Sequence, residues 1–329
     1  MDLLPLIFLF LMGASVLAYV VLDGYDLGVG MLMPAATDEE QSVMVSSIGP
    51  FWDANETWLV LGIGILLAAF PVAHGIVLGA LYLPVVAMLI GLMFRGVAFE
   101  LRIKAEGWHR EMWNWLFWAG SFAASFFQGV MLGRYITGFE SGFFYWVFAL
   151  VVGASLCGGY VLMGATWLIL KTEGALQKKA LAWARWGLLW VALGVILVSL
   201  ATPLISATVR DKWFTFPRFF LVMLLPAATF AMGVWLWITT GRMKDGAASG
   251  DWKPFAASVA IFTLAFLGLA YSIFPYVVID RLTLWEAAAH PSALKVVLIG
   301  AAVVLPFIVG YTVLSYRIFG GKAKAGLYD

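Results

Sequence analysis

Long runs without any charged residue constrain the fold of this chain more than any other feature. The first of them extends from Leu3 to Leu22. An α-helix needs about 20 apolar residues to cross the roughly 30 Å hydrocarbon core of a bilayer. The whole chain is 63% hydrophobic and 12% charged, with a mean hydropathy of +0.95, which is far more apolar than a soluble domain. We therefore predict an all-α polytopic membrane protein, with residues 1–329 forming a single integral-membrane domain.

The apolar runs predict about nine transmembrane helices. Their ranges are 3–33, 52–72, 75–99, 113–134, 143–170, 183–206, 215–240, 254–278 and 293–319. With nine spans the loops alternate between the two sides, and the 20 Lys and Arg residues divide into fourteen on one side and six on the other. Cytoplasmic loops carry the excess of Lys and Arg. This distribution predicts a periplasmic N-terminus and a cytoplasmic C-terminus.

Charged residues in the first three predicted spans need an explanation, because an ionisable side chain costs about 2.5–3.5 kcal/mol in the middle of a membrane helix. Asp23 and Asp26 are three residues apart and therefore share one helical face. The same spacing recurs in the second span, and the third span ends in "FRGVAFE". Six charged residues are thus expected at one depth on the cytoplasmic side: Asp23, Asp26, Asp53, Glu56, Arg95 and Glu100.

Two interpretations of this charged layer remain open. The helix ends can simply reach the lipid headgroups, where carboxylates cost little. Alternatively, the acids lie inside the protein beside polar neighbours such as Asn55, as a structural network or as a proton relay. The apolar run after Asp26 and the apolar flanks of Asp53 favour the second interpretation, with Arg95 as the expected counter-ion.

The sequence offers no catalytic, metal or redox centre of its own. None of its three histidines lies in the middle of a predicted span, so we expect no haem ligand here. The single cysteine, Cys157, allows neither a disulfide nor a thiolate metal site. A net charge of +1 gives no indication of a nucleic-acid partner.

Three motifs resemble subunit II of the cytochrome bd-type quinol oxidases. They are "DGYDLGVGML" at 23–32, "GPFWDANETWLV" at 49–60 and "FRGVAFELR" at 94–102. The similarity continues through "GATWLILKTEGALQ" at 164–177 to "GAAVVLPFIVGYTVLSYRIFGGK" at 300–322 and covers essentially the whole length. The short segment at 206–215 resembles the cyanide-insensitive branch of the family.

The resemblance implies a multi-pass subunit of a respiratory complex in the bacterial inner membrane. In this family, subunit I carries haem b, haem d and the quinol-oxidising loop, and subunit II has no haem ligand. The two subunits form a pseudosymmetric heterodimer, often with a small single-span third chain, and some members hold ubiquinone as a structural filler. The complex oxidises quinol and reduces O₂ to water, and it is electrogenic because protons are released and consumed on opposite sides of the membrane.

The resemblance also implies a role for the acidic layer, because protons for water formation come from the cytoplasm. Family members place residues at the positions of Asp26 and Asp53 in a proton path, with Asp23, Glu56 and Arg95 as lesser candidates. Asn55 and Glu100 belong to the same layer. Trp58, on the same predicted span as Asp53, either packs in the interior or lines an apolar route for O₂. Two other classes of function remain: a proton-coupled membrane transporter, and a subunit that only stabilises its haem-bearing partner. Charges confined to the first third of the chain argue against a transporter, whose sites lie near mid-bilayer.

Overall fold

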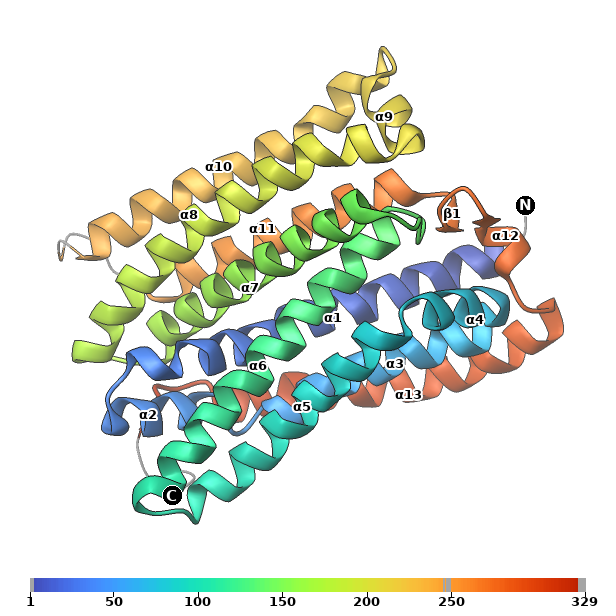
Figure 1. Cartoon of the computed structure of the whole chain (residues 1–329). Helices are drawn as coiled ribbons and strands as arrows, with labels where there is room; N and C mark the ends of the chain where they lie inside the picture. Colours follow the sequence, from blue (N-terminus) through green and yellow to red (C-terminus); the bar gives the residue numbers. More distant parts are fainter. Residues whose placement is uncertain (1–2, 245, 247–249, 325–329) are drawn as a thin grey trace.

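The computed structural model describes residues 3–244, 246 and 250–324, and it is almost entirely helical (Figure 1). The helices are α1 (Leu3–Leu32), the 3₁₀-helix η1 (Met33–Ala35), α2 (Asp38–Ile48), α3 (Trp52–Ala69), α4 (Pro71–Ala80), α5 (Tyr82–Ile103), α6 (Gly107–Ile136), α7 (Phe143–Lys171), α8 (Gly174–Ile205), α9 (Ala207–Phe214), α10 (Arg218–Lys244), α11 (Trp252–Ile273), α12 (Leu284–Ala287) and α13 (Pro291–Ile318). Two short antiparallel strands, β1 (Tyr276–Val278) and β2 (Leu282–Thr283), form a hairpin between α11 and α12.

Eight helices of the described residues are long and apolar enough to cross a membrane, which confirms an all-helical membrane fold. The remaining predicted span, 52–72, corresponds to α3, whose first turns carry "WDANE" and are too polar for the same criterion. Pro71 begins the separate helix α4, so that the next span starts at Tyr82 and not at 75. The predicted span 254–278 is also too long, because α11 ends at Ile273, ahead of Pro275.

The loops alternate between two opposite ends of the bundle, as the sequence predicts (Figure 1). The N-terminus lies at one end with the β-hairpin and α12, and the C-terminus lies at the other end with α2. This arrangement agrees with an odd number of crossings. Which end faces the cytoplasm stays a prediction from the Lys and Arg distribution.

Glycines allow α1 and α7 to meet with their backbones in contact. A Cβ atom added to Gly28 would lie 1.8 Å from the carbonyl oxygen of Tyr160, and one added to Gly164 would lie 2.4 Å from the backbone of Gly28. On α6, Gly129 and Gly133 face α7 just as closely, with would-be Cβ distances of 2.6 Å. Close approach through small residues compensates for the weak hydrophobic driving force between helices in lipid. It also fixes α1, which carries the acids, in the centre of the molecule.

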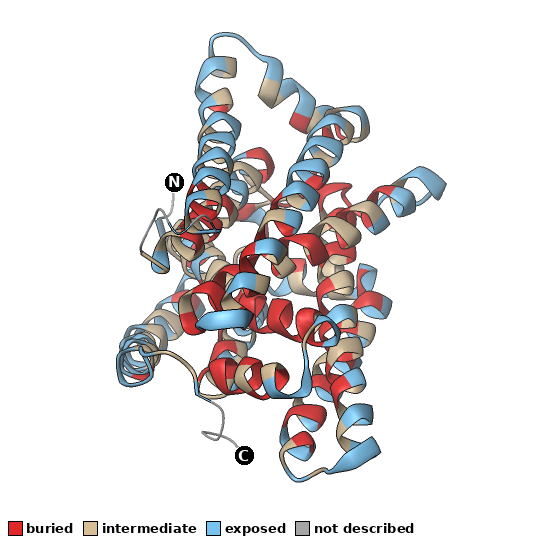
Figure 2. Ribbon diagram, turned by 90° about the vertical axis from the view of Figure 1, so that its left-hand side faces the viewer, coloured by how far each residue is buried: buried red, intermediate tan, exposed pale blue. Residues whose placement is uncertain are grey.

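Buried residues concentrate where the central helices meet, and the outer helices are largely exposed (Figure 2). Many of the exposed side chains are large and apolar. Most of the last half of α7 is buried, whereas the apolar stretch of α13 is not buried by the rest of the chain. Lipid and partner chains are the environments in which such apolar faces are stable.

Replacing Gly28 with alanine should destabilise the protein, because the new methyl group overlaps the Tyr160 carbonyl and the helices must separate. Overpacking of this kind costs about 1–3 kcal/mol. Thermal unfolding of the purified assembly measures the effect. Gly75→Ala is the matched control, since nothing lies within 4 Å of a Cβ at that position. Equal melting temperatures for the two variants would contradict the close α1–α7 contact.

Candidate proton-handling network

Two aspartates of α1 are completely buried in the interior of the bundle. Asp23 and Asp26 each have an exposed fraction of 0%. They lie on the last third of α1, where Gly24 and Gly28 bring the neighbouring helix close. The interpretation that these acids reach the lipid headgroups is therefore wrong for both of them.

A guanidinium from α5 lies between carboxylates from two helices. Arg95 is 1% exposed, and its Nη1 donates to Asp23 Oδ1 at 2.6 Å. Its Nη2 donates to Glu56 of α3, whose side chain is 29% exposed. Arg95 also lies 5.8 Å from the ring centroid of Trp52. The predicted counter-ion of the acidic layer is confirmed, and it joins α1, α3 and α5.

Asn55 holds the second aspartate. Its Nδ2 donates to Asp26 Oδ2 at 2.8 Å and lies 2.9 Å from the hydroxyl of Tyr25. On its other side, the Oδ1 of Asn55 accepts from the hydroxyl of Tyr316 on α13 at 3.3 Å. The hydroxyls of Tyr25 and Tyr316 are 2.5 Å apart. Asp26 is thus connected to three other side chains, one of which comes from the last helix of the chain.

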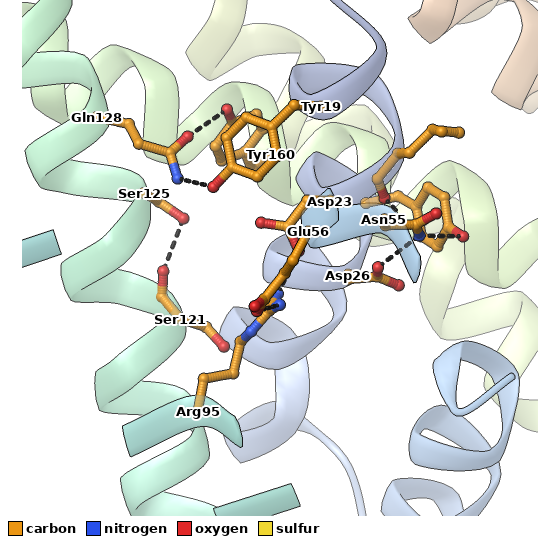
Figure 3. A network of polar contacts seen from close by, with 12 residues as sticks. Tyr19, Asp23, Asp26, Asn55, Glu56, Arg95, Ser121, Ser125, Gln128 and Tyr160 are labelled. Carbon is orange, nitrogen blue, oxygen red and sulfur yellow. Dashed lines mark hydrogen bonds and ion pairs between the residues drawn. The ribbon is translucent and has the colours of Figure 1, made fainter. Parts of the chain in front are cut away.

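A second cluster of polar side chains lies on the other side of Asp23 (Figure 3). Gln128 of α6 donates from Nε2 to the hydroxyl of Tyr19 at 2.6 Å, and it accepts at Oε1 from the hydroxyl of Tyr160 at 2.7 Å. Tyr19 precedes Asp23 by one helical turn and shares its face. Polar side chains therefore continue from the acids into the middle of α6 and α7. We call the whole set the acid network: Tyr19, Asp23, Tyr25, Asp26, Asn55, Glu56, Arg95, Gln128, Tyr160 and Tyr316.

Three polar atoms of the acid network are buried without a hydrogen-bond partner in the described chain. They are Asp23 Oδ2, Asp26 Oδ1 and Arg95 Nε. Buried polar groups in proteins are nearly always paired. In addition, the network contains three carboxylates and a single guanidinium, and an unbalanced buried charge is unfavourable. The arrangement can therefore hold an exchangeable proton or water between the two aspartates.

Two predicted members of the charged layer lie outside the acid network. Asp53 and Glu100 are both exposed in this chain, whereas the other four are buried or half-buried. That all six share one depth of the membrane stays a prediction. The spacing of Asp53 and Glu56 puts them on neighbouring positions of one helix, but only Glu56 turns toward Arg95. Asp53 therefore lies one turn outside the buried part, at the surface.

Five polar residues of the network escaped the sequence analysis: Tyr19, Tyr25, Gln128, Tyr160 and Tyr316. Tyrosines inside spans look like ordinary apolar side chains. Gln128 did carry a signal, because it is an amide deep within a stretch of its span that carries no charge. An amide at such a depth in lipid needs a partner on a neighbouring helix.

Trp58, the candidate for an O₂ route, lies on α3 one turn beyond Asn55 and is 9% exposed. Its Nε1 is buried without a hydrogen-bond partner in the described chain. These observations fit a packed indole, and the O₂ route stays a prediction.

Helix α2 closes the end of the bundle at which the acids lie. Gln41 donates to the carbonyl of Met33 at 3.1 Å and accepts from Asn114 of α6 at 2.6 Å. Glu40 forms an ion pair with Lys179 at 2.6 Å. Burial by itself raises the pKa of Glu40, but hydrogen bonds from Lys179 and Thr37 outweigh it and lower that pKa. The carboxylate therefore stays ionised at neutral pH and holds α2 against α8.

The positions of the histidines do not fit haem ligation. A haem needs axial ligands from buried positions, but His74 is only partly buried, and His109 and His290 are exposed. No group of three His, Cys, Asp or Glu residues in the described part of the chain is arranged to hold a metal ion. The histidines of this chain are therefore unsuited to ligate a haem inside the bundle.

Comparison with known proteins identifies the family. The model of the family described as cytochrome bd terminal oxidase subunit II matches residues 4–319. This chain belongs to that family. It is 29% identical to cytochrome bd-I ubiquinol oxidase subunit 2 of Escherichia coli strain K12, over 98% of this chain and 96% of the relative.

Two further similarities agree with the family assignment. Cytochrome bd ubiquinol oxidase subunit 2 of Bacillus subtilis is 30% identical, over 91% of this chain and 90% of the relative. The fold matches a chain of the bd oxidase from Geobacillus thermodenitrificans with a TM-score of 0.79 at 16% identity, covering 97% of this chain and 99% of that chain. The protein is thus a multi-pass subunit of a quinol-oxidising terminal oxidase in the bacterial plasma membrane, a complex that contains haem and a subunit I.

Replacing Arg95 with leucine should strongly destabilise the protein, because it leaves Asp23 and Glu56 without their shared cation. Removing one partner of a buried ion pair costs about 3–5 kcal/mol. Thermal unfolding of the purified complex measures the loss, with the exposed Arg210→Leu as the control. An Arg95→Leu variant as stable as the control would show that the ion pairs contribute nothing to folding.

Proposed function

We propose that the acid network conducts protons from the cytoplasmic surface toward the oxygen-reducing centre of the haem-bearing subunit I. The complex oxidises ubiquinol, as the named function of its relatives in Escherichia coli and Bacillus subtilis suggests. Haem b and haem d belong to subunit I in this proposal. The chain also stabilises subunit I, for which the unburied apolar face of α13 offers a large contact surface.

One observation carries the proposal: Asp26 is completely buried, and one of its carboxylate oxygens is unused within a polar network that reaches the surface. Its Oδ2 accepts from Asn55, whereas Oδ1 has no hydrogen-bond partner in the described chain. Most buried side-chain oxygens in proteins accept a hydrogen bond, so the unused oxygen of Asp26 has room for a proton or a water molecule. A proton carrier needs an oxygen that can bind and release a proton.

The path begins at the exposed end of α3. Asp53 collects protons at the surface, and Glu56 lies one turn further along the same helix. Arg95 holds Glu56 and Asp23 on its two terminal nitrogens, which keeps these carboxylates close together. A guanidinium stays protonated in proteins. Arg95 therefore supplies a fixed positive charge, and the transferred proton moves between the carboxylates.

Beyond Asp23 the proton can follow hydroxyl and carboxyl groups. Asp26 lies on the same helical face as Asp23. Tyr19 and Tyr25 can each donate one hydrogen bond and accept another, as a relay requires. Glu100 is exposed, and we propose that it only collects protons at the surface.

The proton-coupled transporter is set aside because the chain belongs to an oxidase subunit family. The cyanide-insensitive branch, the small third subunit and a bound ubiquinone remain proposals from the resemblance. Turnover would be electrogenic because the acid network takes up the protons that are consumed in water formation, whereas the protons of quinol are released on the opposite side of the membrane.

Replacing Asp26 with asparagine keeps the shape of the side chain but removes its ability to release a proton. We expect ubiquinol-driven oxygen consumption by the purified complex to fall at least about tenfold, since a positioned proton-transfer group contributes about 10²–10⁴-fold. Haem absorbance should remain unchanged, because this chain supplies no haem ligand in the proposal.

Two further variants make the result specific. Glu106→Gln, at an exposed position before α6, should leave turnover unchanged. Asp53→Asn should lower turnover less than Asp26→Asn, because water at the surface can replace an exposed carboxylate. Full activity in Asp26→Asn would refute the proton path.

A further inference from the structure

The last helix, α13, contacts the acid network through Tyr316. This residue lies against Tyr25 and Asn55, which precede it in the sequence by 291 and 261 residues. We propose that this C-terminal segment, residues 316–323, positions Asp26 through Tyr316 and Asn55. The inference rests on the proposed role of Asp26 in proton transfer.

The first step is the hydrogen-bond contact itself. Tyr316 donates to Asn55 Oδ1, and Asn55 donates from Nδ2 to Asp26 Oδ2. An amide that accepts on one side and donates on the other has a fixed orientation. The amide of Asn55 also donates from Nδ2 to the carbonyl of Leu22 at 3.2 Å, so Tyr316 and Leu22 together keep Nδ2 facing the carboxylate of Asp26.

The ring of Tyr316 is held in place by an aromatic cluster. It stacks on Phe51 with centroids 4.5 Å apart, and it lies edge-on to Trp167 at 6.2 Å. Tyr25 stacks on the same indole at 4.0 Å. The two tyrosines that surround Asn55 therefore share one rigid support.

Two lysines bind the residues that follow α13 to the rest of the chain. Lys171, at the end of α7, donates to the carbonyls of Phe319 at 2.5 Å and of Gly321 at 3.1 Å. Lys322 forms an ion pair with Asp251 at 2.5 Å and donates to the carbonyl of Thr172 at 3.0 Å. We call these contacts the C-terminal latch.

The latch matters because the rest of the described chain covers little of α13. The apolar stretch of the helix is not buried by the other helices, and its other end is tied by the hydrogen bond from Ala289 to the carbonyl of Ala69. The position of Tyr316 relative to Asn55 consequently depends on the latch together with the aromatic cluster. Loss of the latch or of the Tyr316 hydroxyl should alter proton delivery by Asp26, although neither change removes a carboxylate that carries protons.

The test is a double-mutant cycle in the purified complex, with oxygen consumption measured across a range of pH. Tyr316→Phe keeps the ring and removes only the hydroxyl. We expect about a fivefold loss of turnover, the factor that one ordinary hydrogen bond gives, together with a shift of the pH at half-maximal turnover. Lys322→Ala should act in the same direction.

Matched controls lie nearby in the chain. Tyr311→Phe removes the hydroxyl of an exposed tyrosine on the same helix, and Lys324→Ala removes an exposed lysine beyond the latch. Neither should change turnover or its pH profile. Haem absorbance checks that every variant assembles.

The double-mutant cycle distinguishes failure of the positioning role of Tyr316 from failure of the proposed proton path. In an Asp26→Asn background, Tyr316→Phe should have no further effect, because residues that act through one group are not additive. The same fivefold loss in that background, or no loss in the parent protein, would overturn the positioning role alone. Unchanged turnover in the single Asp26→Asn variant would instead refute the proposed function.

Discussion

The burial of carboxylates around one guanidinium is the constraint on which the rest of the structure depends. Asp23, Asp26 and Glu56 come from two helices and Arg95 from a third, in a region where lipid surrounds the protein. Charges in such an environment must be paired inside the protein. The close packing of α1 through Gly28 and the closure by α2 both serve to keep these groups away from lipid.

The same constraint connects the two ends of the chain. Asn55 requires partners on both sides, and it obtains one of them from Tyr316 on the last helix. The otherwise weakly packed α13 is therefore linked to the acids by its polar end, while its apolar face stays available to a neighbouring chain. In the proposed function, proton handling and subunit assembly therefore meet in α13.

The sequence predicted the helical membrane fold, since uncharged runs of this length allow few alternatives. It also predicted that Asp23, Asp26 and Arg95 lie together, because helices of alternating direction bring them to one depth. It did not indicate that Asp53 and Glu100 are exposed, since depth along a helix does not determine which side of it faces the interior. The contacts of Gln128 and Tyr316 could not be predicted, because they depend on how distant helices pack against one another.

The most direct test of the account is a structure of the intact oxidase at a resolution that shows ordered water. We expect water molecules at Asp26 Oδ1 and Asp23 Oδ2, continuing to the surface of subunit I that faces its oxygen-reducing centre. Closely packed apolar side chains between these oxygens and subunit I, without water, would contradict a proton path through this chain.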